Sequence, residues 1–370
     1  MERPKQSGNA LAKARVVDSP AGPGDANGSI SPTPKLASEV LQRLDELVQR
    51  GELGAIAPLP TGFHPLDRFL DGGVRPGELI LVGGAQGVGK TSLTLQMARN
   101  LVVQAQATCG YVCYEHDEAF LLQRLISMES LVGRGKLDPD GLPITELREL
   151  LLAAGRSRDY MGEATVEDAL AGRTAATMAL GRIRTFGERL YLLKASGSTT
   201  DVPALRHLVR EWKERHGPRV VLFVDYLQKV PVFPPTNDEG EKVTQVADAL
   251  KELALSEDVP IVAVVAGDRE GLRARRLRIH HLRGSSSLMY ESDIVLILNN
   301  KYRIVARENI TFNPHRAKDY KNWVVCTIEK NRAGRDLIDL EFRSFFAFGA
   351  FDPEGGAVAE QLLDERIHEE

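Results

Sequence analysis

The stretch LVGGAQGVGKTSL, residues 81 to 93, constrains this chain more than any other feature of its sequence. It holds Gly84, four further residues and then Gly89-Lys90-Thr91, which fits the pattern G-x-x-x-x-G-K-[ST]. An apolar run precedes the pattern and a helical pattern follows it, as expected for a strand, a phosphate-binding loop and a helix. Glycines let backbone N–H groups curve around phosphates, and the start of the helix adds partial positive charge. The stretch therefore predicts a nucleoside triphosphate site.

Side chains near this loop have expected partners on the nucleotide. Lys90 is expected to reach the β- and γ-phosphates, and Thr91 to ligate Mg²⁺. Asp225 follows the apolar residues of the run VVLFVDY, where a carboxylate can hold Mg²⁺ through water, although an aspartate there can also cap a turn. ATP and Mg²⁺ are thus the predicted cofactors, with Thr91 and Asp225 at the metal. The full predicted nucleotide-binding set is Gly84, Gly87, Gly89, Lys90, Thr91, Ser92 and Asp225.

Seven apolar runs predict the fold class. They are LILVGG, GYVCYE, YLLKAS, VVLFVDY, PIVAVVAG, DIVLILNN and WVVCTIEK. Each is almost continuously apolar, as strands buried on both faces are. Helical patterns lie between the first five runs, near residues 91–104, 118–131, 201–215 and 242–256. The alternation predicts an α/β fold with a doubly wound, mainly parallel sheet. The last runs follow one another without long helices, so we expect an antiparallel C-terminal extension.

Local composition divides the chain into four expected parts. Residues 1–35 are rich in Pro, Gly, Ser and Ala without periodicity and predict a disordered tail. Residues 36–60 comprise a connector and a linker helix, whose apolar stripe packs either on its own domain or on a neighbouring subunit. The nucleotide-binding domain is expected over 61–353, with a helical insertion near 132–189. Residues 354–370 are expected to form a polar C-terminal tail.

Overall composition is that of a soluble globular protein. Hydrophobic residues make up 43% of the chain, charged residues make up 26%, and the net charge is −4, so bulk charge does not indicate a nucleic-acid partner. Cys109, Cys113 and Cys326 lie in apolar runs without a CxxC pair, which favours buried reduced thiols over metal ligands. No apolar run approaches the roughly 18 residues of a membrane span, so we expect a cytoplasmic protein without membrane contact.

Glu115 is a candidate catalytic group because of its place at the end of GYVCYE. In open α/β sheets, ligands bind beyond the carboxyl ends of the strands. A carboxylate there can polarise an attacking water molecule, but it can equally be a solvated side chain at a strand end. Position alone does not separate these two interpretations, and His116 and Asp117 follow directly.

Four ordered motifs resemble the RecA-type ATPase superfamily, and most closely the ATPase domain of DnaB-type replicative helicases. TGFHPLDRFLDGGVRPGELILVGG resembles the opening of that domain, which RadA and KaiC relatives share. VLFVDYLQ resembles its Walker B segment, LRGSSSLMYESDIVLIL its segment of Arg and small residues before a strand, and EKNRAG its Lys-x-Arg-x-Gly motif. The match runs from about Thr61 to Phe351. It implies a RecA-like fold and an ATP-dependent DNA helicase or translocase that acts on single-stranded DNA in replication or repair.

The resemblance also implies catalytic roles. It makes Glu115 the general base, and it makes Lys330 and Arg332 a pair that reaches the neighbouring subunit's γ-phosphate. The two basic residues are two apart on an expected strand, so their side chains leave the same face. A finger that acts in trans implies a homo-oligomeric ring, of hexameric type. The alternative is the basic end of a surface strand.

Arginines and small residues between the fifth and sixth apolar runs are the candidate DNA contacts. In the family, this region lines the central channel and follows the backbone of single-stranded DNA, where arginines suit phosphate contacts. The alternative is a solvated charged face. The predicted DNA-binding residues are Arg269, Arg273, Arg275, Arg276, Arg283, Ser285 and Ser286.

Three departures from the family pattern leave other functions open. Ala266 stands where the family carries a glutamine that senses the γ-phosphate, and its methyl group cannot hydrogen-bond. The loop 233–242 is acidic and would repel phosphate. About fifty residues precede the domain, so we expect no N-terminal collar domain and no primase recruitment by the usual route. The alternatives are a RadA- or KaiC-like remodelling or regulatory ATPase that unwinds no strands, and a non-hydrolysing assembly module.

Overall fold

The computed structural model divides into two compact units, Met1–Glu52 and Leu53–Glu370. In the first unit, helix α1 (Ala37–Arg50) forms where a linker helix was expected. Its apolar side chains at Val40, Leu41 and Val48 are exposed. The predicted tail, up to residue 33, lies outside the described residues. The structure describes residues 34–51, 57–133, 140–161, 165–305 and 318–363.

The second unit contains one ten-stranded sheet among its described residues. The strand order is β10-β8-β7-β6-β1-β5-β4-β2-β3, and β9 pairs with β8. The strands from β6 to β3 in this order are parallel, whereas β7, β8 and β10 are antiparallel to their neighbours. This arrangement confirms the α/β fold with a mainly parallel sheet and an antiparallel C-terminal extension. The bounds are β1 (Leu79–Gly84), β2 (Thr108–Cys113), β3 (Leu190–Lys194), β4 (Val220–Asp225), β5 (Ile261–Ala266), β6 (Ile294–Asn300), β7 (Trp323–Asn331), β8 (Ile338–Phe345), β9 (Ala350–Phe351) and β10 (Gly356–Ala357).

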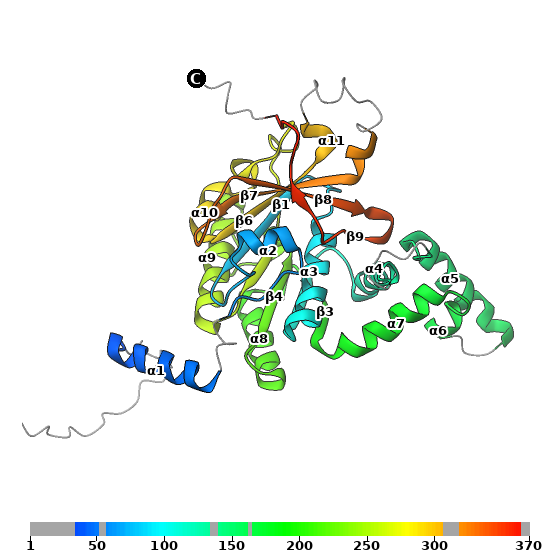
Figure 1. Ribbon diagram of the computed structural model, residues 1–370, viewed down its shortest axis with the longest axis horizontal. Helices are drawn as coiled ribbons and strands as arrows, with labels where there is room; N and C mark the ends of the chain where they lie inside the picture. Colours follow the sequence, from blue (N-terminus) through cyan, green and yellow to red (C-terminus); the bar gives the residue numbers. More distant parts are fainter. Residues whose placement is uncertain (1–33, 52–56, 134–139, 162–164, 306–317, 364–370) are drawn as a thin grey trace, which may run out of the picture. The chain divides into compact units, whose positions relative to one another are not determined.

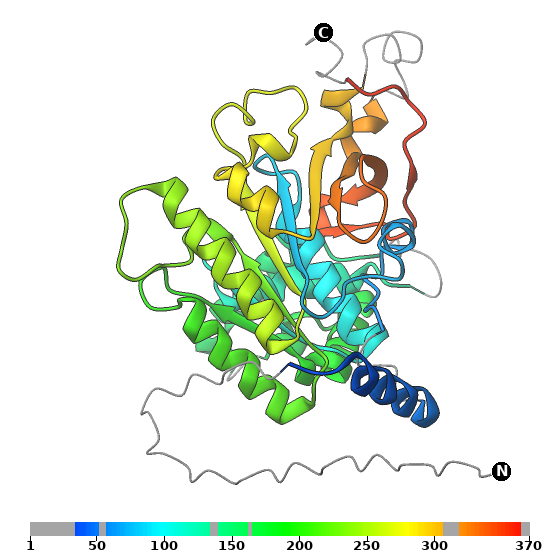
Figure 2. The ribbon, with the colours of Figure 1, turned by 90° about the vertical axis from the view of Figure 1, so that its left-hand side faces the viewer.

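Helices cover both faces of the parallel part of the sheet (Figures 1 and 2). Successive side chains of a strand point to opposite faces, so Ile80 packs in one core layer and Leu81 in the other. The first layer holds residues of α3 and α4, and the second holds residues of α8 and α9. The helices are α2 (His64–Phe69), α3 (Lys90–Ala105), α4 (Glu118–Ser130), α5 (Ile144–Met161), α6 (Val166–Ala169), α7 (Thr174–Phe186), α8 (Val202–His216), α9 (Glu239–Glu257), α10 (Ser285–Glu291) and α11 (Lys301–Ile304). No described helix combines the length and the apolar character needed to cross a bilayer.

The expected helical insertion consists of α5, α6 and α7, which lie beside α4 (Figure 1). It has a small core of its own, to which α4 contributes Ile126. Glu129 of α4 is completely buried and forms ion pairs with Arg99 of α3 and Arg182 of α7. Because a buried carboxylate is stable only with partners, this cluster ties the insertion to the helix that follows the phosphate-binding loop.

The C-terminal segment differs from the expected polar tail. Residues up to Leu363 are described, and β10 joins the edge of the sheet. Glu360 pairs with the buried Lys301, and the backbone N–H of Leu363 donates to the carbonyl of Ile304 at 2.7 Å. A charged side chain and backbone groups of this segment thus hold it on the domain. Residues 364–370 lie outside the described part.

Candidate nucleotide-binding site

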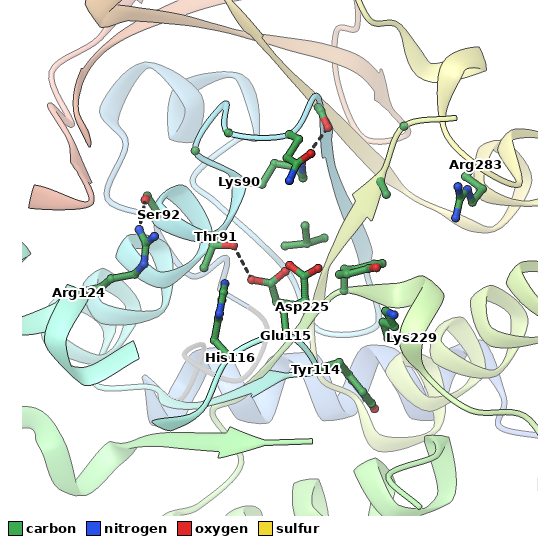
Figure 3. A pocket seen from close by; sticks show the side chains of 18 of the residues that line it. Lys90, Thr91, Ser92, Tyr114, Glu115, His116, Arg124, Asp225, Lys229 and Arg283 are labelled. Atoms are coloured by element: carbon green, nitrogen blue, oxygen red, sulfur yellow. Dashed lines mark hydrogen bonds between the residues drawn. The ribbon is translucent and has the colours of Figure 1, made fainter. Parts of the chain in front are cut away.

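A cleft of about 1100 Å³ opens at the carboxyl ends of β1, β2, β4 and β5. It is lined by the phosphate-binding loop, by residues that follow β2 and β4, and by Ala266 at the end of β5. Figure 3 shows its labelled side chains around one space, with Lys90 above the carboxylates of Glu115 and Asp225. Parallel strands bring their carboxyl ends to one edge of a sheet, which is where ligands bind in this class of fold.

The predicted phosphate loop lines this cleft. Gly84 and Gly89 have φ angles of 153° and 100°, a region in which a side chain is strained. A β-carbon at Gly89 would also lie 2.7 Å from the ring of Phe351, so the loop admits only glycine there. Lys90 Nζ donates to the carbonyls of Gly84 and Ala85 at 2.8 and 2.9 Å. Burial lowers the pKa of Lys90, and the negative charges of Asp225 and Glu115 oppose that shift.

Thr91 and Asp225 meet across the cleft floor. The hydroxyl of Thr91 donates to Asp225 Oδ2 at 2.8 Å, and the hydroxyl of Tyr111 donates to the same oxygen at 3.0 Å. Burial raises the pKa of Asp225, while these two hydrogen bonds lower it and repulsion from Glu115 raises it further. Tyr111 was not among the predicted site residues, because it lies in the run GYVCYE and is indistinguishable there from a core aromatic residue.

The donor set fits a nucleotide with Mg²⁺. Hydroxyl and carboxylate oxygens, as in Thr91 and Asp225, are the ligands that Mg²⁺ prefers. Arg124 of α4 also faces the cleft, and its buried Nε has no hydrogen-bond partner among the described residues. Its terminal nitrogen donates to Ser92 Oγ at 3.3 Å, and burial lowers its pKa. An unpaired buried donor beside the loop suits an anionic or acceptor-rich ligand. When bound, Mg²⁺ would neutralise charge on the phosphate oxygens.

Glu115 and its two neighbours have different surroundings. Glu115 is exposed, lies two residues beyond β2 and lines the cleft. Asp117 instead caps α4, since its carboxylate accepts the N–H of Phe120 at 2.8 Å. His116 stacks on the ring of Phe120, with ring centroids 3.8 Å apart. Of the two carboxylates, Glu115 is the one placed to act on a group in the cleft.

Lys330 and Arg332 lie together but away from the cleft lining. Lys330 ends near the carboxyl end of α10, where its ammonium donates to the carbonyls of Met289 and Ser292. Arg332 follows β7, pairs with Asp293 at 3.2 Å and donates to the carbonyl of Tyr290. Burial lowers the pKa of Lys330, and the positive charge of Arg332 adds to this effect. The two cations therefore form one group, and they do not line the cleft of their own chain.

The arginine loop, residues 267–284, divides into exposed and buried arginines. Arg269, Arg273 and Arg275 are exposed. Arg283 lines the cleft and pairs at 2.6 Å with Glu239, the first residue of α9, so the end of the acidic segment 233–242 is helical and not a loop. Ser286 of α10 is exposed, while the side chain of Ser285 lies outside what the structure describes.

Arg276 corrects the expected DNA-binding set. Its exposure is only 4%, and it pairs with Asp339 at 2.5 Å and donates to Thr327 Oγ1 at 3.2 Å. Arg278 is similarly buried and pairs with Glu329. To contact nucleic acid, Arg276 would have to leave its buried position and Asp339, and Arg278 would have to leave the fully buried Glu329 without a partner, which is costly. The local sequence carries no sign of this burial, because the partners come from strands more than fifty residues away.

The three cysteines are buried and free, as expected. Burial raises the pKa of Cys113 to about 11, so it is a thiol at neutral pH. No cluster of three or more His, Cys, Asp or Glu side chains suited to a metal occurs in the described part of the chain. All three side chains pack in the first core layer.

Comparisons with known proteins point to one family. Residues 58–348 match the sequence model described as the DnaB-like helicase C terminal domain. The chain is 27% identical over 290 residues to the replicative DNA helicase DnaB of Treponema pallidum (strain Nichols), covering 78% of this chain and 55% of that protein. The chain spans about half the length of the curated relatives it matches.

Two solved structures share the fold. One is a chain solved as an ATPase domain, which superposes with a TM-score of 0.66 at 21% identity, covering 86% of this chain and 99% of that one. The other is a DnaB-like replicative helicase, solved in a study of its interactions with primase, which superposes with a TM-score of 0.62 at 21% identity, covering 88% and 68%. At this identity the likeness concerns the fold alone.

Proposed function

Because the chain belongs to the family of DnaB-like helicase C-terminal domains, we propose that it hydrolyses ATP to move along single-stranded DNA in replication or repair. The observation that carries the proposal is the shared cleft. Arg283 of the arginine loop lines the same cavity as Lys90 and Glu115. Through the side chain of Arg283, the loop that is proposed to hold DNA therefore reaches the cavity that is proposed to hold the phosphates.

The proposed chemistry uses the cleft residues in distinct roles. Lys90 and the backbone of the phosphate loop bind the phosphates, while Thr91 and Asp225 hold Mg²⁺. Glu115 accepts the proton of the attacking water, a contribution of about 10²- to 10⁴-fold for a general base. Arg124 offers a further donor to the nucleotide, since its Nε is buried and unpaired among the described residues.

Lys330 and Arg332 are proposed to complete the cleft of a neighbouring copy. Neither lines the cleft of its own chain, and both lie together beside the carboxyl end of α10. Positive charge supplied in trans stabilises the charge that develops on the transferred phosphoryl group. Such a heterologous contact closes into a ring when the rotation between subunits allows it, and a hexamer is the ring that we propose.

Single-stranded DNA is the proposed polymer, and its backbone is the proposed contact. The exposed residues Arg269, Arg273 and Arg275, together with Arg283, offer donors for phosphates. Ser286, exposed in the first turn of α10, adds a small polar group, and Ser285 is proposed as a contact from the sequence pattern alone. These contacts would position a strand without reading its sequence.

Cytoplasmic location and a loader or a primase-linked protein as partner, recruited by a route other than the family's usual one, extend the proposal. A primase is considered because the second solved neighbour is a DnaB-like helicase studied for its interactions with primase. A RadA- or KaiC-like remodelling ATPase is not favoured, since the family match and the curated relatives are DnaB helicases.

The test measures phosphate release with and without single-stranded DNA, and strand displacement from a forked duplex in parallel. We expect DNA to stimulate phosphate release and ATP to drive displacement. A variant with Arg273→Ala and Arg275→Ala should bind DNA more weakly and show a smaller salt dependence of binding, while nucleotide binding stays unchanged. Phosphate release at the same rate with and without single-stranded DNA would refute the proposed function.

A further inference from the structure

The side chain of Gln228 joins two strand ends to the arginine loop. Its Oε1 accepts the backbone N–H of Ala266 at 3.2 Å, and its Nε2 donates to the carbonyl of Arg283 at 3.4 Å. Gln228 itself lies three residues beyond Asp225, in a short turn of 3₁₀ helix (Leu227–Lys229), and is 7% exposed. One buried amide thus contacts a residue at the end of β5 and a residue of the loop, from a position just after β4.

Both partners of Gln228 line the cleft, and Ala266 lies beside the phosphate loop. Ala266 is the register partner of Gly84, whose carbonyl holds the ammonium of Lys90. On its other side, β5 pairs with β4, where Val264 lies opposite Asp225. A displacement of the phosphate loop or of Asp225 therefore acts on the strand end that Gln228 holds.

From Gln228 the contacts continue into α9 and α10. The N–H of Arg283 donates to the carbonyl of Ala266 at 3.1 Å, which closes a ring of backbone and side-chain hydrogen bonds. A β-carbon at Gly284, where α10 is capped, would lie 2.4 Å from a methyl group of Val243, so this turn sits tightly on α9. Lys242 of α9 donates from Nζ to the carbonyl of Gln228 at 3.1 Å. If the arginine loop shifts at Arg283, these contacts must break or their partner residues must move with the loop.

We propose that Gln228 is a positioning residue that couples the phosphate end of the cleft to Arg283 and the start of α10. β5 ends in Ala266, whose methyl group makes no hydrogen bond. Among the described residues, Gln228 has the only side chain that bonds to both Ala266 and Arg283. Gln228 touches neither nucleotide nor polymer in this scheme. It passes a shift of one strand end to the loop, and the inference rests on the proposed DNA-stimulated hydrolysis.

Two substitutions separate coupling from support of the fold. Gln228→Leu removes both hydrogen bonds, and Gln228→Glu keeps an acceptor for Ala266 N–H while it removes the donor to Arg283. Gln245→Leu is the matched control, because Gln245 is exposed on α9 and bonds only to Glu241 among the described residues. For both Gln228 variants we expect the stimulation of phosphate release by single-stranded DNA to fall by about fivefold or more, the lower end of allosteric coupling. DNA-independent release and nucleotide affinity should stay within about twofold of wild type.

The inference is overturned if a folded Gln228→Glu variant shows the same stimulation of phosphate release by DNA as wild type. It is also overturned if the variant loses stability, nucleotide affinity and basal phosphate release together, because that result marks a purely structural residue. If the wild-type protein shows no stimulation, the proposed function fails, and a DNA-independent measurement decides the inference. Hydrogen exchange across residues 266–284 is then compared with and without a non-hydrolysable ATP analogue. A nucleotide-dependent change that is present in wild type and absent in Gln228→Glu supports coupling. The same change in both proteins, or none in wild type, refutes it.

Discussion

The hydroxyl of Thr91 lies 2.8 Å from Oδ2 of Asp225, although 134 residues separate the two along the chain. The contact joins the first turn of α3 to the end of β4 and brings together the two oxygen ligands suited to Mg²⁺. Metal binding at this cleft therefore requires the two segments to meet in the folded sheet.

Replacing Glu115 with glutamine should stop turnover but spare binding. The amide keeps the size of the side chain and cannot accept a proton, so phosphate release should fall by about 10²-fold or more while nucleotide affinity changes little. Phosphate release and equilibrium nucleotide binding are measured side by side. Asp117→Asn is the control, because asparagine also caps helices and α4 should keep its start. If Asp117→Asn is the inactive variant and Glu115→Gln is active, the roles of the two carboxylates are reversed.

Asp225→Asn should change how stability depends on pH. Burial raises the pKa of Asp225 above 3.8, so with rising pH the unfolded chain loses this proton before the folded chain does. Wild type is therefore penalised as pH rises from about 4 through the raised pKa, and the asparagine variant is not. We expect the Tm of nucleotide-free Asp225→Asn minus the Tm of wild type to become larger as pH rises through this window. Mg²⁺-dependent turnover should be lost in the variant.

Asp71→Asn is the matched control for this pH series, since the Asp71 side chain is 89% exposed. The variant loses only an exposed ion pair with Arg75, which contributes little to stability, so its Tm should differ little from that of wild type. A flat difference for Asp225→Asn would show that burial of Asp225 carries no penalty in solution.

Mixing two inactive variants should restore activity if Arg332 acts on a neighbour. Arg332→Ala lacks the finger and Lys90→Ala lacks the phosphate-binding ammonium, so each alone should release phosphate slowly. In random mixed rings, about one quarter of interfaces combine an intact Lys90 with an intact Arg332 from the adjacent copy. Phosphate release by the mixture should therefore exceed that of either variant.

The control mixture is Lys90→Ala with Glu115→Gln, whose changes lie in the same cleft. Every cleft in such rings carries one of the two losses, whichever subunit stands beside it, so activity should stay low. Equal, low activity in both mixtures would mean that Arg332 does not work across an interface.

Glu239→Gln should tighten DNA binding modestly. Glu239 pairs with Arg283, but the two side chains are 56% and 42% exposed, so the pair is weak and its release yields a small gain, about twofold to fivefold in affinity. Fluorescence anisotropy with labelled single-stranded DNA at fixed salt measures this. Glu241→Gln removes the same charge two residues away without touching Arg283, and should have a smaller effect. Equal gains in both variants would attribute the effect to net charge alone.

Most of the parallel sheet could be predicted from the sequence, because strands buried on both faces leave a nearly unbroken apolar run. β8 was missed for the converse reason. Its sequence IDLEFRSF mixes charged and apolar residues, and several of its side chains are partly exposed. β10 has only two residues, which is too short for any pattern.

The candidate site was predictable where chemistry and short spacing coincide, as in Gly89-Lys90-Thr91. It was not predictable where long-range pairing decides. Arg275 and Arg276 are neighbours in one basic run, yet Arg275 is exposed and Arg276 is buried against Asp339. Tyr111 and Gln228 likewise owe their positions to the sheet order, which places the ends of β2, β4 and β5 side by side. Periodicity carries no information about such pairings.

The two carbonyls that hold Lys90 have a consequence for the departure of any polyanion bound at the loop. An entering polyanion must take the ammonium from Gly84 and Ala85, so part of its attraction to Lys90 is offset by the contacts it displaces. When the polyanion leaves, the same carbonyls receive the ammonium again, and no buried cation is left bare. We therefore expect the loop's own backbone to shorten the residence time of a bound polyanion and to favour repeated binding and departure.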